Sequence, residues 1–186
     1  EGAKKAFQGE YREAEQILKD ALNDYKSINI YSNLGNVLVK QNKYEEALKF
    51  YEYWGNTGIM YSDALKNQII VNQKLGDYKK ASQLANHHFR LWSKKYSDQD
   101  VFNLGVLFFQ AKEYALGYKL MNDFRNKKLK YNPEAWSGEC ANLFGVFALK
   151  KNEYEFAISL FEEALRIDPN LTSAKQNLEL LRRNKK

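Results

Sequence analysis

The sequence predicts an all-α solenoid of antiparallel helix pairs, and a repeating phrase carries this prediction. The phrase ends in tyrosine and recurs five times, at Tyr11, Tyr44, Tyr78, Tyr114 and Tyr154, with spacings of 33, 34, 36 and 40 residues. Three residues after each tyrosine comes a small residue: Ala14, Ala47, Ala81, Gly117 and Ala157. Self-similarity at such a period is typical of repeat proteins, in which each unit stacks on its neighbours.

Each tyrosine phrase is expected to form the turn between two helices. The residue two positions before the tyrosine is Gly9, Asn42, Gly76, Lys112 or Asn152. Glycine and asparagine tolerate the left-handed conformation that ends a helix, so four of these five positions suit a helix C-cap. An acidic residue precedes the tyrosine in four repeats, where its charge favours the N-terminus of the next helix. The exception is Lys43.

The helices on both sides of the turns have one apolar face each. After one turn, the apolar residues fall at helical spacing, on Tyr44, Ala47, Leu48 and Tyr51. Glycines occupy equivalent places inside three of the preceding helices, at Gly35, Gly105 and Gly145. Because glycine costs a helix about 1 kcal/mol relative to alanine, we expect the paired helix to approach closely at these positions.

With these features, the sequence resembles the tetratricopeptide repeat (TPR) family. One repeat has Tyr31, Leu34, Gly35, Leu38, Asn42, Tyr44, Ala47, Tyr51 and Trp54, and the last has Phe144, Gly145, Ala148, Asn152, Tyr154, Ala157, Phe161, Ala164 and Pro169. The resemblance implies one TPR-like α-solenoid domain over residues 1–186, with about five repeats in a right-handed superhelix. The expected repeats are 1–27, 28–60, 61–96, 97–131 and 132–170, followed by a capping helix over 171–186.

The middle of the chain departs from the family pattern. Large residues, Trp54, His88 and Phe124, stand where the outer repeats have Ala21 and Ala164. The third repeat has Ile69 in place of the in-helix glycine and Asn72 where an apolar residue is expected. Residues 126–131 are predicted to form an extra, lysine-rich connection, after which Asn132 and Pro133 restart a helix as its N-cap and first turn. These features favour irregular curvature in the centre.

The two ends of the chain differ. Asp168, Pro169 and Asn170 stop the last repeat, and a final helix is expected from about Thr172, with Ala174, Leu178 and Leu181 on its apolar face. Such a helix with a polar outer side lets a solenoid end in water. At the other end, Gly2 aligns with Gly35, so the first helix lacks its opening two turns. We therefore expect that Glu1 is not the natural start of the protein.

Composition and motifs argue against several classes of function. The net charge is +6, but Arg182, Arg183, Lys185 and Lys186 supply four of these charges, so the pattern argues against a nucleic-acid binder. No catalytic, cofactor or metal motif is present, the adjacent His87 and His88 point about 100° apart on a helix, and Cys140 suits a buried position. We expect no enzymatic activity, no cofactor and no metal. The sequence contains no recognisable signal peptide or membrane span, and a cytoplasmic or a membrane-tethered location stays open.

The remaining candidate is the concave groove that the first helices of such repeats line. The resemblance places backbone-binding asparagines at Asn33, Asn67 and Asn103, whose amides both donate and accept. The full expected set is Asn33, Asn36, Lys66, Asn67, Ile70, Phe102, Asn103, Val106, Phe109, Asn142 and Val146. Two alternatives stay open here: Asn67 and Asn103 could only tie one helix to the next, and Phe109 could belong to the core.

These features predict a non-enzymatic scaffold that binds a neutral or apolar peptide or helical segment of a protein partner. The family's clamp for a C-terminal carboxylate is disfavoured, because the matching positions, Ser32, Asn36, Asn67, Gln99 and Asn103, include the clamp's asparagines but none of its cations. The alternative function is a self-associating structural component of a larger assembly, with or without a membrane tether, which pairs through the N-terminal edge and the bulky centre. Membrane contact is expected only through segments outside this sequence or through the basic tail.

Overall fold

The computed structural model describes residues 1–131 and 136–184, except for the side chains of Lys95 and Asn184. Within these residues the chain forms eleven α-helices and one short 3-10 turn, and it contains no β-strand, which confirms the all-α prediction. The chain divides into two compact units, Glu1–Ser93 and Lys94–Lys186. The boundary lies close to the end of the third expected repeat, 61–96.

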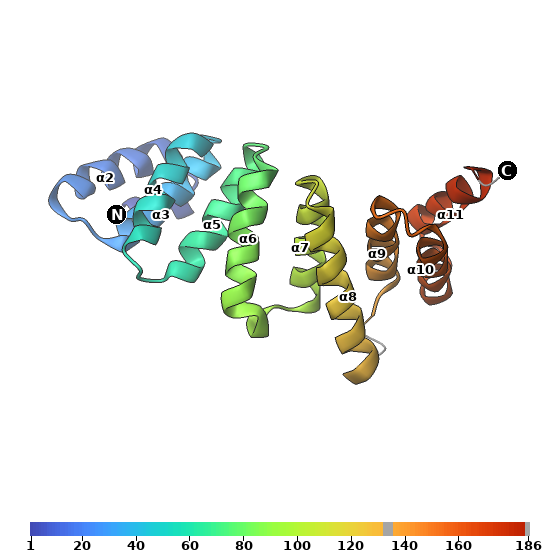
Figure 1. Ribbon diagram of the computed structural model, residues 1–186. Coiled ribbons are helices and arrows are strands. Elements are labelled where there is room, and N and C mark those ends of the chain that lie inside the picture. Colours follow the sequence, from blue (N-terminus) through green and yellow to red (C-terminus); the bar gives the residue numbers. More distant parts are fainter. Residues whose placement is uncertain (132–135, 185–186) are drawn as a thin grey trace. The chain divides into compact units, whose positions relative to one another are not determined.

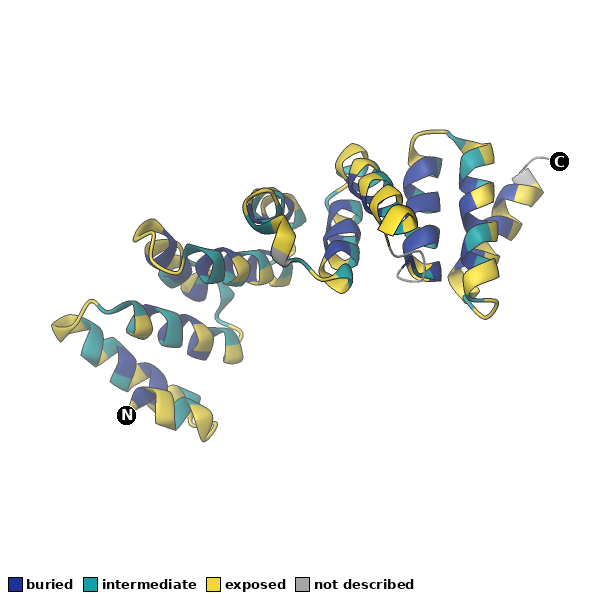
Figure 2. Cartoon of the chain, turned by 90° about the horizontal axis from the view of Figure 1, so that it is seen from below, coloured by how far each residue is buried: buried dark blue, intermediate teal, exposed yellow. Residues whose placement is uncertain are grey.

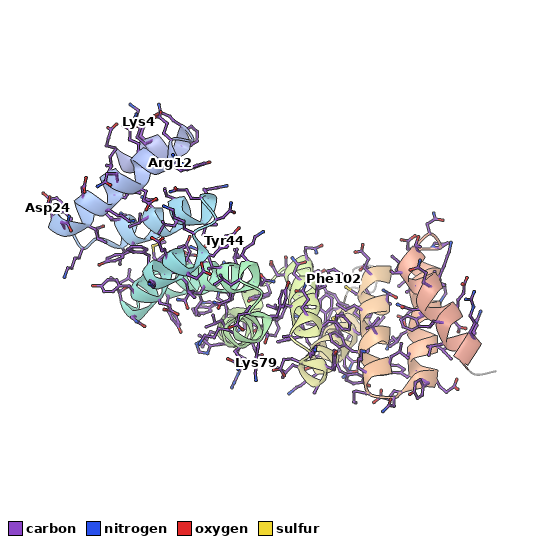
Figure 3. The ribbon with its side chains drawn as sticks, turned by 90° about the horizontal axis from the view of Figure 1, so that it is seen from above. Lys4, Arg12, Asp24, Tyr44, Lys79 and Phe102 are labelled. Atoms are coloured by element: carbon purple, nitrogen blue, oxygen red, sulfur yellow. The ribbon has the colours of Figure 1, made fainter. Side chains whose placement is uncertain are left out.

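The first unit consists of six helices, each packed against the next in the chain (Figure 1). They are α1 (Gly2–Phe7), α2 (Tyr11–Asp24), α3 (Ile28–Lys40), α4 (Tyr44–Asn56), α5 (Tyr61–Lys74) and α6 (Tyr78–Trp92). The 3-10 turn η1 (Ser93–Lys95) follows α6. Tyr44, at the start of α4, is marked in Figure 3.

The second unit consists of five helices: α7 (Asp98–Gln110), α8 (Tyr114–Tyr131), α9 (Gly138–Lys150), α10 (Tyr154–Ile167) and α11 (Thr172–Asn184). Each helix again packs against the next, and α9 also contacts α7 and α11. In both units the buried residues form a stripe along each helix and the exposed residues lie opposite (Figure 2). This is the pattern of amphipathic helices stacked around a shared core.

The tyrosine phrase has the predicted role, because each of the five tyrosines is the first residue of a helix. The residue two positions before it adopts a positive φ in every case, at Gly9, Asn42, Gly76, Lys112 and Asn152. Lys112 does so with φ 59°, although it is neither glycine nor asparagine. In two turns the tyrosine hydroxyl donates to the side chain of this residue: Tyr44 to Asn42 at 2.7 Å and Tyr154 to Asn152 at 3.0 Å.

The in-helix glycines allow close helix approach, as predicted. A Cβ added to Gly35 would lie 2.5 Å from Cε1 of Tyr51, and one added to Gly145 would lie 2.5 Å from Cε1 of Phe161. In both cases the aromatic ring belongs to the paired helix. In the third repeat the equivalent positions hold Ile69 on α5 and the buried Ala85 on α6. Here the first helix of the pair has the larger side chain and the second helix the smaller one.

The bulky residues of the middle repeats are buried. Trp54 is 3% exposed and its indole Nε1 donates to the backbone oxygen of Ile59 at 3.0 Å. His88 is 2% exposed, and Phe124 packs its ring 5.9 Å from that of Trp136. Each side chain therefore fills space inside its own unit.

The prediction of a connection over residues 126–131 is wrong, because these residues form the last turns of α8. Lys128 stabilises this extension through an ion pair with Asp98 on α7, at 2.6 Å. The predicted helix start at Asn132 and Pro133 lies outside the described residues. The helix that follows, α9, has Ser137 as its N-cap, and the Ser137 side chain accepts from the backbone N–H of Cys140 at 3.2 Å.

The C-terminal helix forms as predicted. α11 begins at Thr172 and packs against α10 and α9. Its apolar face is buried, with Ala174 at 0%, Leu178 at 6% and Leu181 at 9% exposure. It therefore covers the outer side of the last helix pair.

Candidate partner-binding faces

His88 and Cys140 lie in buried, structural environments, whereas His87 is exposed. His88 is buried, and its Nε2 lies 2.8 Å from the Ser62 hydroxyl. Cys140 is buried on α9, and burial raises the pKa of its thiol, which keeps it protonated. Among the residues that the structure describes, no three His, Cys, Asp or Glu side chains cluster as metal ligands would. The described helices also include none whose length and apolar character would let it span a membrane.

In the first unit, the predicted residues lie on the outward sides of α3 and α5. The inward sides of both helices join one hydrophobic cluster, to which α3 contributes Leu34 and Val37 and α5 contributes Ala64 and Val71. On the outward side Asn33 and Asn67 are half-buried, whereas Asn36, Lys66 and Ile70 are exposed. We call these outward sides of α3 and α5 the Asn face.

Two amides of the Asn face have free hydrogen-bonding groups. Neither Asn33 nor Asn67 makes a side-chain hydrogen bond to any residue in the described part of the chain. Asn36 differs, because its Oδ1 accepts from the Tyr51 hydroxyl at 2.7 Å. Asn33 and Asn67 occupy equivalent places in consecutive repeats, each eleven residues before the turn tyrosine. For these two residues, the structure provides no helix-tying role.

In the second unit, the predicted residues lie on α7 and α9, which are in direct contact. Phe102, Val106 and Val146 are half-buried on these helices, and Asn103 is exposed. Figure 3 labels Phe102 on α7. We call this set the apolar face, since three of its four members are hydrocarbon side chains. Such half-exposed side chains can bury further area against a partner.

Two predicted residues of the second unit, Asn142 and Phe109, have roles inside the fold, and a third, Asn103, makes a surface hydrogen bond within its own helix. The Asn142 side chain donates to Ser173 at 3.2 Å and accepts from Asn177 at 3.0 Å, so it ties α9 to α11. Phe109 packs against the rings of Tyr114 and the fully buried Phe147, at 5.8 Å and 6.2 Å between centroids. Its ring therefore supports the core. The amide oxygen of Asn103 accepts from Gln99 at 3.0 Å, one turn earlier on the same helix.

Sequence reasoning left two lysines out of the Asn face. Lys40 and Lys74 lie seven residues after Asn33 and Asn67 and are exposed. Seven residues are nearly two helical turns, so each lysine lies on the same side of its helix as the asparagine. The seven-residue spacing from each asparagine could have predicted that these lysines belong to the Asn face.

Comparisons with known proteins support the resemblance to tetratricopeptide repeats. Family models described as tetratricopeptide repeat match residues 27–52 and 142–175. A search of curated proteins found no significant sequence match.

Similar solved structures include the TPR protein YrrB, described as having an unusual peptide-binding site, with 19% identity, a TM-score of 0.73 and coverage of 96% of this chain and 88% of that one. Another is MamA (41-end) from Desulfovibrio magneticus RS-1, with 19% identity, a TM-score of 0.67 and coverage of 87% and 86%. A third is MamA AMB-1, with 16% identity, a TM-score of 0.69 and coverage of 92% and 90%. At such identities the likeness concerns the fold.

Proposed function

We propose that this chain, which is a tetratricopeptide repeat protein, is a non-enzymatic scaffold that binds a peptide or helical segment of a protein partner. The binding surfaces are the Asn face of the first unit and the apolar face of the second. TPR repeats generally serve as interaction modules, and this role fits a chain in which His88 and Cys140 are buried in the fold.

The observation that carries the proposal is the pair of free amides at Asn33 and Asn67. A half-buried amide without a protein partner makes fewer hydrogen bonds to water than an exposed one, and a bound ligand could supply the missing hydrogen bonds. The backbone of an extended peptide has both donors and acceptors, so it can satisfy such amides whatever its side chains are. Their equivalent places in consecutive repeats suit a chain that crosses both helices.

The apolar face supports binding of another kind. Phe102 and Val106 on α7 and Val146 on the adjoining α9 offer hydrocarbon surface without a charged residue among them. Aromatic and aliphatic side chains of this kind often anchor a partner's apolar residues. A helical segment with one apolar side is the ligand that fits this face. The peptide-binding description of YrrB, a protein of similar fold, is consistent with the proposal.

The test uses the full chain and a linear peptide selected on it from a random display library. The variant Asn33→Ala/Asn67→Ala removes both amides, and we expect it to bind the peptide roughly tenfold more weakly, because two hydrogen bonds contribute about 1 kcal/mol each or less. Circular dichroism should show unchanged helicity, since neither side chain supports the fold. Recovery of no binding peptide, or equal affinity of the variant, would contradict the proposal.

The control variant is Asn56→Ala/Asn126→Ala, which removes two exposed asparagines from the second helices α4 and α8. It should bind as the wild type does. An equal loss of peptide affinity in the control would show that asparagine substitutions weaken binding wherever they are made, and not through the Asn face.

The alternative of self-association through the bulky centre has lost its main support. Trp54, His88 and Phe124 are all buried, so they offer no surface to a second copy. The N-terminal edge retains one exposed aromatic, Phe7 on α1, which is 94% exposed. Self-association at that edge stays a prediction.

A further inference from the structure

We propose that the Asn face selects peptide segments that carry acidic side chains. This inference rests on the proposed function, since it names the chemistry of the segment that the Asn33 and Asn67 amides would hold. Its basis is the pattern of charge on the outward sides of α3 and α5.

Three lysines surround the free amides. Lys40 and Lys74 stand in the last turns of α3 and α5, roughly 10 Å along the helix axis from Asn33 and Asn67. Lys66 immediately precedes Asn67 and is exposed. None of the three forms an ion pair with an acidic group of the described residues. The cations of this face are therefore available to a ligand.

The acidic residues of the face do not balance these lysines. Asp63, on the same side of α5, is half-buried and is the only carboxylate among the outward positions from Asn29 to Lys40 and from Asp63 to Lys74. One carboxylate against three lysines leaves an excess of two positive charges. Burial lowers the pKa of His88, and the charge of Lys66 adds to this effect while Asp63 opposes it. A ligand with acidic side chains complements this field.

The positive charge is particular to the first unit. In the fourth repeat, the positions equivalent to Lys66 and Lys74 hold Phe102 and Gln110, both uncharged. In the fifth repeat the residue equivalent to Lys74 is Lys150, whose Nζ lies 5.3 Å from the ring centroid of Tyr114. The two faces therefore differ in the ligand chemistry that they fit.

The lysines are expected to act on selectivity more than on the fold. A lysine in the last turn of a helix also complements the helix dipole, so its presence alone would not indicate a ligand. Three unpaired lysines on the two helices that carry the unpaired amides do, because Lys40 and Lys74 share a helix side with Asn33 and Asn67. Exposed ion pairs each contribute little to binding and weaken with salt, so the acidic preference should be moderate and salt-sensitive.

The experiment selects random linear peptides on the 186-residue chain and on its variant Lys40→Gln/Lys66→Gln/Lys74→Gln. We expect peptides selected on the wild type to be enriched in aspartate and glutamate relative to the library, and this enrichment to vanish on the variant. One selected peptide is then synthesised with an amidated C-terminus, together with a copy in which glutamine and asparagine replace its acids. The acidic form should bind the wild type roughly tenfold more tightly than its neutral copy, at low salt.

The control variant is Lys49→Gln/Lys79→Gln/Lys80→Gln, which makes the same charge change at exposed lysines of α4 and α6; Lys79 is labelled in Figure 3. It should keep the acidic preference. Loss of the preference in this control would assign it to net charge and overturn the inference, as would equal binding of the acidic and neutral peptides.

The variant Asn33→Ala/Asn67→Ala separates this inference from the proposed function. Peptides that depend on the two asparagines but show no acidic enrichment would leave the proposed function standing and overturn the inference. Peptides that bind the variant Asn33→Ala/Asn67→Ala as tightly as the wild type would overturn the proposed function and this inference together. An amidated C-terminus in the probe ensures that any acidic preference comes from side chains.

Discussion

At the scale of single residues, Glu15 of α2 is a buried carboxylate held by three side chains. It is 7% exposed, and its carboxylate accepts from Lys19 at 2.6 Å, Lys43 at 2.7 Å and Gln41 at 2.7 Å. Burial alone would raise the pKa of Glu15, but these hydrogen bonds outweigh it and lower the pKa to about 2. Lys43 is the residue that breaks the acidic pattern before the turn tyrosine. Its cation explains the exception, because it pairs with the preceding repeat.

Replacing Glu15 by glutamine should make stability less dependent on pH. Because the pKa of Glu15 is lower in the folded chain than its ordinary value of 4.5, its stabilisation is present above pH 4.5 and is lost as the pH falls towards 2. We expect Glu15→Gln to lower the free energy of unfolding by about 2 kcal/mol at pH 7, and the difference from wild type to shrink towards zero near pH 2. Urea denaturation across this range measures it.

The control for this prediction is Glu45→Gln, which removes an exposed carboxylate in the first turn of α4. Its free energy of unfolding should match that of the wild type within about 0.5 kcal/mol. A difference between wild type and Glu15→Gln that stays constant from pH 7 to pH 2 would show that the charge of Glu15 is not its source.

At the scale of helix pairs, a glycine on the first helix and a ring on the second form one packing unit. Gly35 and Tyr51 show it in the second repeat, and Gly145 and Phe161 show it in the fifth. Each glycine stands nine residues before the turn tyrosine and each ring seven residues after it. The glycine lowers the stability of its helix, and the close packing of the ring against it compensates for this cost.

The variant Gly35→Ala should be destabilised by roughly 1–3 kcal/mol, because its Cβ would meet the Tyr51 ring at 2.5 Å. This cost should outweigh the gain of about 1 kcal/mol in helix propensity. In the double variant Gly35→Ala/Tyr51→Leu the clash is absent. Its loss of stability should therefore be smaller, by about 1 kcal/mol or more, than the summed losses of the two single variants. Denaturant unfolding of the four proteins gives the coupling energy.

Gly105→Ala is the matched control for that cycle. Its added Cβ would first meet the ends of flexible side chains, Cδ2 of Leu143 at 3.0 Å and Sδ of Met121 at 3.2 Å. These atoms can move aside, so the cost should be smaller than that of Gly35→Ala. Additive effects in the Gly35 cycle would argue against the ring contact as the cause.

The same pairs show what the sequence could predict and what it could not. Turn positions and the buried small residues followed from spacing alone, because both are set by local backbone geometry. The exchange of sizes at Ile69 and Ala85 was visible in the sequence only when the two positions were compared as a pair. The helical state of residues 126–131 was missed because the lysine-rich stretch was interpreted as a connection, although lysine is a good helix former. The ion pair of Lys128 with Asp98 was not predictable from spacing, since it joins residues far apart in the chain.

For the candidate faces too, the sequence predicted the position of a residue on its helix but not its contacts with other helices. Periodicity placed Asn33, Asn67, Phe102 and Val106 on the outward sides of their helices. It could not distinguish Asn142 from the other asparagines, because the partners of Asn142, Ser173 and Asn177, belong to α11. Side-chain hydrogen bonds between distant helices depend on the packed structure, so spacing alone does not predict them.

At the scale of the whole molecule, each of the two compact units has its own fully buried aromatic residues. The first contains Tyr51, and the second contains Phe144, Phe147 and Phe161. In solenoids, stability is approximately a sum of local terms from each repeat and its neighbours. The units are therefore expected to respond separately to a core substitution.

Native-state hydrogen exchange tests this expectation with two matched substitutions, Tyr51→Ala in the first unit and Phe161→Ala in the second. Each removes a buried aromatic side chain at the same place in its repeat, and each should cost about 3–5 kcal/mol. For Phe161→Ala, we expect faster exchange in α9, α10 and α11, with protection in α2 to α5 unchanged, and the reverse pattern for Tyr51→Ala. Equal acceleration in both units after either substitution would mean that the chain unfolds as one cooperative body. The predicted local response would let the Asn face and the apolar face be altered and measured independently, since a variant in one unit would leave the folded population of the other unchanged.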